Sequence, residues 1–380
     1  MSPIQIKPVR SKEDWDRFID LPWSIYRGDS CWVPPLKLQI RDALDVNKNP
    51  FFRHAVMRPL LALRDGQAVG RVVGIIDENH NRFHKEQTAF FGFFESINEG
   101  KVTELMLGEV SLWAKGRGMT TLRGPVNLST NHECGLLVQG FSDPPAVMMT
   151  YNPPSYPTLL EGWGMQKAKD LFAYSVTRNS RFAERLMAQS ERLKDNSSII
   201  VRSLDTKNFD RDIEILHEIY NDAWEENWGF VPMEPEEFKL MAKEMKAIFD
   251  PRLLLIAEVR GVPAAFSLAL PDINQAVIKV RDGKLFPTGL LKMLWYLKGP
   301  GRRKTINRCR VVTLGIKKEY RHFALGPLFY TEYLKRGPEC GYPVGEASWI
   351  LEDNRAMNRA LEMMCGERTK VYRIYDRALG

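Results

Sequence analysis

Short apolar runs alternate along this chain with stretches whose apolar residues recur every three or four positions, which predicts a mixture of strands and helices. The pattern is clearest near the C-terminus, where 310–316 reads as a buried strand and 327–336 as a helix with one apolar face. A strand at 343–350, a helix that ends near Gly366 and a last strand at 370–375 follow. This order predicts an α/β protein.

Similar elements fill the rest of the chain. Apolar alternation predicts strands at 4–8, 88–95, 121–126, 168–177 and 199–204, and hairpins at 59–76 and 252–270. The hairpins are expected to turn at Asp65-Gly66 and Arg260-Gly261. Helical spacing predicts helices at 12–26, 102–115, 153–162, 212–226 and 235–248. The strand at 168–177 is expected to close the first half.

Matching residues recur in the same order in the two halves, at a nearly constant spacing. The pairs are Val33-Pro34 with Val231-Pro232, Asn152 with Asn354, and Gly164 with Gly366. Any one match is expected by chance, but an ordered set indicates an internal repeat. We therefore expect domains at 1–178 and 198–380, joined by a charge-rich helical linker at 179–197.

Composition and charge are those of an ordinary globular protein. Of the 380 residues, 44% are hydrophobic and 27% are charged. No apolar run is long enough to span a bilayer, and the N-terminus lacks the apolar core of a signal peptide, so we expect a cytoplasmic protein. The five cysteines lack metal-ligand spacing, which predicts free thiols and no metal. The net charge of +7 suits a polyanionic cofactor or an anionic membrane surface.

The segment after the strand at 310–316 has the features of an anion site. A strand, a turn of small residues and a helix start aim backbone N–H groups at one point, and the helix dipole adds partial positive charge. Ala324 and Gly326 keep side chains away, and Arg321 brings a fixed positive charge. The alternative is an ordinary strand–helix turn with a surface arginine.

This arrangement resembles the GNAT superfamily of acyl-CoA N-acyltransferases, whose signature is Arg/Gln-x-x-Gly-x-Gly/Ala after the fourth strand. Here it reads Arg321-x-x-Ala324-x-Gly326, with alanine in place of the first glycine, and Asn354 and Gly366 match two further family positions. The resemblance implies two tandem GNAT-like domains, each a mixed central sheet flanked by helices. It also implies acyl-CoA as co-substrate, bound by the second domain only.

The resemblance assigns a set of residues to the cofactor. They are Leu314, Gly315, Ile316, Arg321, His322, Phe323, Ala324, Leu325, Gly326 and Asn354. Trp224 and Trp228 end a helix of the kind that covers the acceptor site in this family. No metal is implied.

An insertion at about 127–150 begins with a dense polar row. If the chain is extended there, Asn127, Ser129, Asn131 and Glu133 share one face, because side chains alternate along a strand. Their apolar flanks favour a hydrogen-bonding lining for the acceptor. The other interpretation is a solvated loop rim.

Acyl transfer to an amine needs a base, an oxyanion donor such as a strand N–H, and a proton for the leaving thiolate. Glu133 and Glu346 are the candidate bases, and Tyr372 is a candidate proton donor. GNAT enzymes often supply this proton from a tyrosine in the helix after the asparagine. Leu361 stands close to that position, so the acid is absent or elsewhere.

A second insertion, at 272–308, carries an apolar helix with tryptophan and a basic tail, at 285–304. This combination is typical of interfacial membrane binding, and one interpretation is a peripheral contact with the inner face of the membrane. A core or subunit contact, or the cover of an acyl-chain channel, would give the same pattern. Asp77, His80 and His84 are spaced like a metal cluster, but a solvated loop is the preferred interpretation.

The sequence as a whole predicts an N-acyltransferase that moves an acyl group from acyl-CoA to a small amine or a lipid amine. The apolar insertion favours a long-chain acyl donor or a lipid amine. The length and tandem layout resemble GNAT-like bacterial ceramide synthases, which acylate a sphingoid base. One alternative is a Fem-like aminoacyl transferase that uses aminoacyl-tRNA; another is a non-catalytic acyl-CoA-binding protein of GNAT fold. Aromatic and basic residues are not interleaved as in nucleic-acid binders, so nucleic acid is not an expected partner.

Overall fold

The structure is a computed structural model that describes residues 2–177, 186–188, 190, 199–284, 289, 291, 295–296, 299, 305–364 and 366–380. The chain forms two compact units. The N-terminal unit comprises Met1–Asp170, Val280–Gly289 and Lys370–Gly380, and the C-terminal unit comprises Leu171–Lys279 and Leu290–Thr369. Most of the predicted linker at 179–197 lies outside the described residues.

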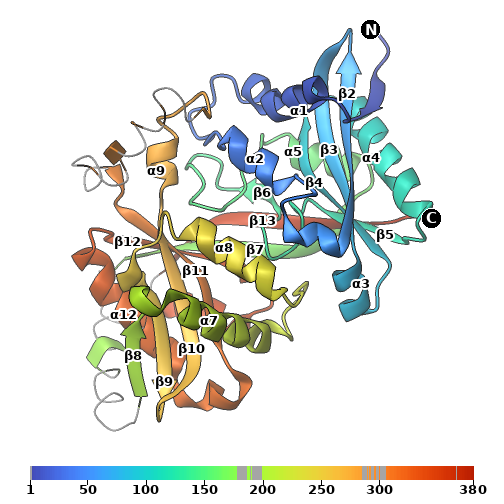
Figure 1. Ribbon diagram of the computed structural model, residues 1–380. Helices are drawn as coiled ribbons and strands as arrows, with labels where there is room; N and C mark the ends of the chain where they lie inside the picture. Colours follow the sequence, from blue (N-terminus) through green and yellow to red (C-terminus); the bar gives the residue numbers. More distant parts are fainter. Residues whose placement is uncertain are drawn as a thin grey trace. The chain divides into compact units, whose positions relative to one another are not determined.

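The N-terminal unit is built on a mixed sheet (Figure 1). Its strands are β1 (Gln5–Pro8), β2 (Ala55–Arg64), β3 (Gln67–Asp77), β4 (Thr88–Ser96), β5 (Thr121–Gly124), β6 (Leu136–Gln139) and most of β13 (Glu367–Ala378). The order is β1-β2-β3-β4-β5-β13, with β6 also paired to β13. The pairs are antiparallel except β4 with β5, which is parallel.

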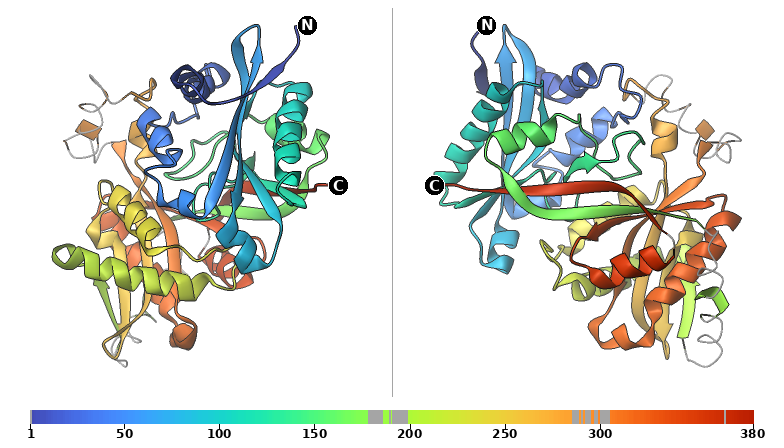
Figure 2. Two further views of the ribbon diagram at one scale, coloured as in Figure 1. Left: turned by 45° about the vertical axis from the view of Figure 1, so that its right-hand side comes forward. Right: turned by 180° about the vertical axis from the view of Figure 1, so that it is seen from behind.

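Helices cover both faces of this sheet. They are α1 (Lys12–Ile25), α2 (Lys37–Ala43), α3 (Glu78–His84), α4 (Gly100–Lys115) and α5 (Tyr156–Gly162), with a 3-10 turn η1 at Pro50–Arg53. Alternation along β3 sets the layers: Gly70 faces Met106 of α4, whereas Arg71 donates to the Phe18 carbonyl of α1. The views of Figure 2 show α4 and α5 on one face, where their apolar residues share a core with β2 to β5.

The C-terminal unit repeats this topology, as the sequence predicts. Its strands are part of β7 (Gln166–Thr177), β8 (Ile199–Ser203), β9 (Leu254–Val259), β10 (Val262–Pro271), β11 (Arg308–Ile316) and β12 (Val344–Leu351), in the order β8-β9-β10-β11-β12-β7. The helices are η2 (Thr206–Asn208), α7 (Phe209–Trp224), α8 (Pro235–Met245), η3 (Pro251–Leu253), α9 (Asn274–Val277), η4 (Lys318–Phe323), α12 (Leu325–Glu339) and α13 (Arg355–Met363). Among the strands described in this unit, only β11 and β12 run parallel. Within the described part of the chain, no helix is long and apolar enough to cross a membrane.

The two halves exchange their last strands. Residues 171–177 of β7 belong to the C-terminal unit and pair with β12, whereas β13 pairs with β5 through Tyr375–Ala378 in the N-terminal unit. The expectation that 168–177 closes the first half is therefore wrong, because the pairing partner of a strand is chosen across long sequence distances. The expected domain limits at 178 and 198 do not follow the compact units at these two strands.

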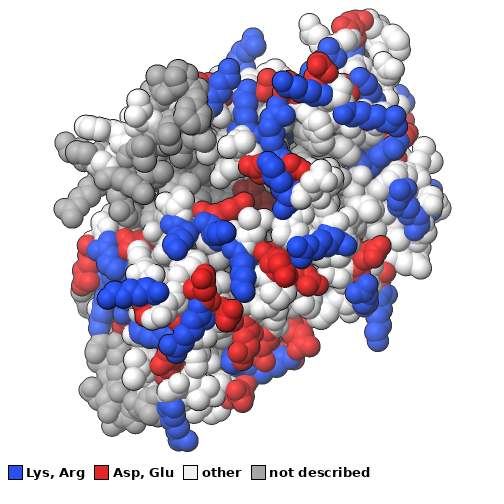
Figure 3. Space-filling model, in the orientation of Figure 1, with Lys and Arg blue, Asp and Glu red and all other residues white. Residues whose placement is uncertain are grey.

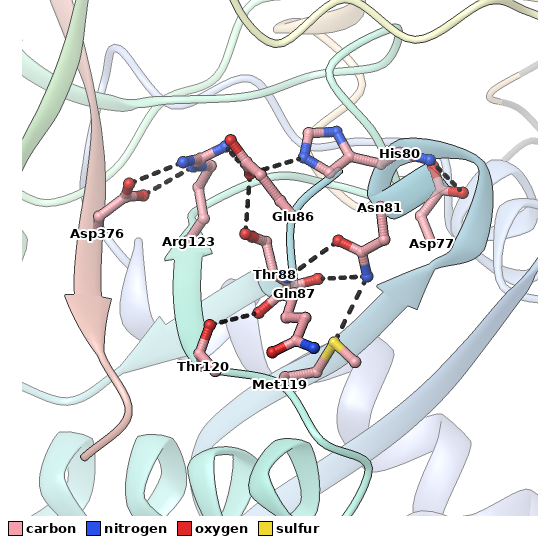
Figure 4. A network of polar contacts seen from close by, with 10 residues as sticks. All are labelled: Asp77, His80, Asn81, Glu86, Gln87, Thr88, Met119, Thr120, Arg123 and Asp376. Carbon is pink, nitrogen blue, oxygen red and sulfur yellow. Dashed lines mark hydrogen bonds and ion pairs between the residues drawn. The ribbon is translucent and has the colours of Figure 1, made fainter. Parts of the chain in front are cut away.

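A network of charged groups holds the end of β13 in the N-terminal unit (Figure 4). Arg123 of β5 makes a bidentate ion pair with Asp376, at 2.8 and 2.9 Å, and contacts Glu86 at 3.1 Å. Glu86 also lies 3.3 Å from Nε2 of His80. The solvated loop expected around His80 is wrong: the segment forms α3, capped by the Asp77 carboxylate, and His80 is 1% exposed. Among the described residues, no group of side chains has the arrangement of a metal site.

Candidate functional site

The parallel strands β11 and β12 separate in the C-terminal unit. Over the described residues they pair only from Arg308 to Val311, opposite Val344 to Ala347, although both strands continue. Beyond this point β12 remains paired with β7, and β11 contains a bulge at Val312. Since α12 follows β11 and α13 follows β12, two helices begin at the edge where the strands part. Such an edge is where open α/β sheets bind ligands.

The predicted anion turn has the expected shape. After β11 the chain makes η4, and Ala324 adopts a left-handed conformation (φ 52°) before α12 begins. Among the described side chains none caps this helix, so the N–H groups of Leu325 and Gly326 in its first turn have no side-chain partner, while Pro327 has no N–H. A methyl group at Gly326 would meet only Cδ1 of Ile316, at 3.9 Å. Uncapped N–H donors beside a residue without a side chain are features of an anion site.

Carboxylates at the end of α7 face the cations of this turn. Arg321 lies 3.1 Å from Glu226 and donates to the Ala223 carbonyl, while the Lys318 N–H donates to Asp222 at 2.8 Å. These groups are largely exposed, and exposed ion pairs contribute at most about 1 kcal/mol. An anionic ligand can therefore exchange places with such carboxylates at little energetic cost.

Some of the residues assigned to the cofactor contact residues assigned to the acceptor at the end of α7. The Trp224 ring, at the end of α7, lies against Gly315 on β11 and stacks on Tyr220 with ring centroids 4.9 Å apart. Trp228 follows in the turn after α7 and is half-buried. Asn354 is engaged differently, since its side chain caps α13 by accepting the Met357 N–H at 3.1 Å.

Glu346 lies on β12 in a buried polar chain that sequence reasoning did not find. Ser348 Oγ donates to Glu346 at 3.0 Å, and Arg310 donates to both oxygens of Ser348 at 2.9 and 3.0 Å. Arg308 lies 3.9 Å from the other carboxylate oxygen. Glu346 and Arg310 are each 2% exposed. The available signal was two arginines at alternate positions of an otherwise apolar strand, because alternation puts both on one face.

The polar row at 127–133 is not extended, so that expectation is wrong. The chain folds back at once: the Asn127 N–H donates to the Glu133 carbonyl at 2.8 Å, and Val126 pairs with Cys134. Ser129 Oγ contacts His132 Nδ1 at 2.9 Å. The four polar side chains therefore do not share a strand face.

The N-terminal unit uses the backbone donors of its own β4 internally. The Phe93 N–H donates to the Asn127 side chain at 2.7 Å, and the Ser96 N–H donates to the Tyr156 hydroxyl at 2.8 Å. A methyl group at Gly92 would overlap the Val126 carbonyl, so the neighbouring chain already fills this position. β4 has the place in the N-terminal unit that β11 has in the C-terminal unit. The contacts of Phe93, Ser96 and Gly92 therefore fill the edge of β4.

The candidate catalytic residues are divided between the units. Glu346 belongs to the C-terminal unit, whereas Glu133 and Tyr372 belong to the N-terminal unit. Tyr372 is fully buried on β13 opposite Leu137, and Glu133 is half-buried in its loop. Leu361, which the sequence puts close to the family's tyrosine position, is 2% exposed in an apolar cluster with Tyr174, Ile350 and Met364.

The chain is similar to two curated proteins over nearly its full length. It is 35% identical over 383 residues to the bacterial ceramide synthase of Caulobacter vibrioides (strain NA1000 / CB15N), covering 99% of this chain and 98% of the relative. It is 33% identical over 379 residues to protein YghO of Escherichia coli (strain K12), covering 98% and 95%. No protein-family model matches the sequence.

Among solved structures, a tandem GNAT protein from the clavulanic acid biosynthesis pathway, determined without AcCoA, superposes with a TM-score of 0.57. The match covers 100% of this chain and 99% of that one, at 12% identity. This likeness identifies the fold as two GNAT domains in tandem.

Proposed function

The chain belongs to the tandem GNAT superfamily, in the family of the Caulobacter ceramide synthase and YghO, and from this membership we propose that it is an acyl-CoA-dependent N-acyltransferase. The reaction forms an amide from a thioester and an amine and releases coenzyme A as the thiol. The observation that carries the proposal is the uncapped N-terminus of α12 beside the separated strands β11 and β12.

The cofactor is proposed to bind the C-terminal unit alone. Support comes from the turn around Ala324 and Gly326, where no described side chain caps the N–H donors and a methyl group at Gly326 would meet only Ile316. In the N-terminal unit the corresponding strand donates to Asn127 and Tyr156, so those donors are unavailable to a ligand. A strand N–H of β11 past the bulge at Val312 is the proposed oxyanion donor.

The acceptor is proposed to be a long-chain lipid amine of the sphingoid type. The name of the Caulobacter relative supports this class, and so do the exposed apolar side chains of Leu291 and Trp295. Trp224 and Trp228 are the proposed acceptor-side residues in the C-terminal unit. The proposal that the acceptor also contacts Asn127, Ser129 and Asn131 rests on the sequence alone, because these side chains do not share one strand face.

Glu346 is the preferred base among the candidates. It is a buried carboxylate on a strand of the unit that carries the proposed cofactor turn, whereas Glu133 and Tyr372 belong to the other unit. Its partners Ser348 and Arg308 hold it in one orientation, as a base acting through a water molecule requires.

Release of the thiol from palmitoyl-CoA, with sphinganine as acceptor, tests this proposal directly. We expect amine-dependent thiol release and N-palmitoyl-sphinganine by mass spectrometry, with weak use of acetyl-CoA. Glu346→Gln should lower kcat about 100-fold, and Glu133→Gln is the comparison variant. Tight CoA binding without turnover on any amine would instead favour the non-catalytic acyl-CoA-binding protein. Amide formation only with aminoacyl-tRNA would favour the Fem-like activity.

The surface gives no support to the Fem-like alternative on the face that Figure 3 shows. Over the part that carries α7, Lys and Arg side chains lie among Asp and Glu side chains. Carboxylates of α7 also pair with cations of the turn before α12, such as Glu218 with Lys317. Mixed charge of this kind does not attract a long polyanion as a continuous basic groove does.

A further inference from the structure

Tyr330 lies on α12, and its side chain faces α13. Its hydroxyl donates to Sδ of Met357 at 2.8 Å, and its ring packs against the cluster that contains Leu361. Met357 and Leu361 are four residues apart on α13, so they lie on the same face, one turn from each other. The Tyr330 hydroxyl is thus about one helical turn from the position where the family's tyrosine would stand.

The hydroxyl of Tyr330 has an unusually weak partner. Among the described residues its only acceptor is the Met357 thioether, and a thioether sulfur is a weak acceptor. A half-buried phenol that lacks a strong acceptor gains free energy when a better one arrives. The contact also shows that a sulfur atom fits at hydrogen-bonding distance from this hydroxyl.

The location agrees with the path of an acyl-CoA. A chain bound at the turn before α12 and inserted between β11 and β12 passes the facing sides of α12 and α13, because these helices start where the strands part. Tyr330 is on the second turn of α12, close to that start. Burial raises the pKa of the Tyr330 phenol to about 12, so it keeps its proton at neutral pH.

We propose that Tyr330 is the general acid that protonates the leaving thiolate, in place of the family's tyrosine, close to whose position this chain has Leu361; this proposal rests on the proposed function. The amine nitrogen forms a bond to the thioester carbon, and the carbon–sulfur bond breaks. The phenolic proton passes to sulfur and gives the free thiol. The phenolate then regains a proton from solvent, and the proton lost by the amine leaves through the base.

Two acyl donors distinguish an acid role of Tyr330 from a purely structural role. With palmitoyl-CoA, Tyr330→Phe should lower kcat about 100-fold, with KM for palmitoyl-CoA within about twofold. With a palmitoyl ester of an aromatic thiol, which leaves as a stable thiolate, the same variant should react nearly as fast as wild type. A structural defect would lower both rates equally, and that result overturns the proposal.

The chain offers a matched control and a rescue. Tyr333→Phe, three residues further along α12, removes a hydroxyl that donates to the Leu253 carbonyl at 3.2 Å and should leave kcat unchanged. Leu361→Tyr in the Tyr330→Phe background should restore part of kcat, because it returns a phenol one turn away on α13. Wild-type kcat in Tyr330→Phe overturns the role of Tyr330 while leaving the proposed function intact. Absence of turnover in the wild type overturns both.

Discussion

The indole ring of Trp224 lies so close to Gly315 that a methyl group at Gly315 would overlap two of its ring carbons. The last residue of α7 therefore packs directly on the backbone of β11, at the end where β11 has left β12. The ring is held in place by Tyr220 and Phe266, whose centroids are 4.9 and 5.9 Å away. This contact explains why position 315 is a glycine and connects a proposed acceptor residue with a proposed cofactor residue.

Gly315→Ala should destabilise the protein by about 1–3 kcal/mol, the usual cost of overpacking. Trp224→Leu removes the overlapping ring, so the alanine should cost much less in that background. Chemical denaturation of the four proteins gives the coupling energy. Gly108→Ala is the control, because Gly108 is in α4 with nothing within 4 Å of an added methyl group, and it should stabilise slightly. An equal cost of the alanine in both backgrounds would contradict the contact.

Gly326→Glu should abolish CoA binding in titration calorimetry, because it puts a carboxylate at the start of α12 where the pyrophosphate is proposed to bind. Gly326→Ala should bind CoA like the wild type, since its methyl group meets only Ile316 at 3.9 Å. Gly326→Gln, with nearly the size of the glutamate variant but no charge, separates the effect of charge from that of bulk. Unchanged affinity in the glutamate variant would remove the pyrophosphate from this turn.

His80 should make the N-terminal unit sensitive to acid. Burial, followed by the nearby His84, lowers the pKa of His80 to about 4, against about 6.5 in an unfolded chain. The unfolded state therefore binds more protons between these values, so stability is full above about pH 6.5 and falls as the pH drops towards 4.

The expected loss across that window is about 3 kcal/mol, at about 1.4 kcal/mol for each pKa unit. His80→Gln removes the titrating group and should flatten this part of the stability profile, measured by urea denaturation at a series of pH values. Parallel profiles for the wild type and the variant would show that other groups control acid unfolding.

Trp295→Glu should weaken binding to anionic vesicles in a flotation assay. Trp295 and Leu291 are 56% and 68% exposed, while the adjacent Tyr296 packs on the core and lies beneath the Lys279 ammonium at 4.6 Å. The remainder of the apolar segment predicted at 285–304 lies largely outside the described residues. Binding should fall at high salt, because screening reduces attraction between basic residues and lipid headgroups. A folded Glu variant that floats like the wild type would reject the membrane contact.

The local pattern of residues alone determined many of the strands, helices and turns of this protein. Both hairpins turn where the sequence predicts, with positive φ at Asp65-Gly66 and at Arg260-Gly261, because adjacent strands and their turn residues are specified by neighbours in sequence. The strand, turn and helix around Ala324 also follow the prediction. Each of these features depends on alternation, on periodicity or on the conformational freedom of a few residues.

Only the tertiary structure decided which strands pair and which polar groups are buried together. β7 and β13 have similar patterns, so nothing local indicates that each completes the other half's sheet. The burial of His80 and the hydrogen bonds from Arg310 to Ser348 likewise depend on other elements of the fold. The return of the chain at Asn127 is a short-range turn that alternation of polar residues alone did not predict. Hydrogen bonds and burial at positions such as His80 and Arg310 are fixed only when the sheet assembles, and for that reason residue type and spacing alone could not reveal them.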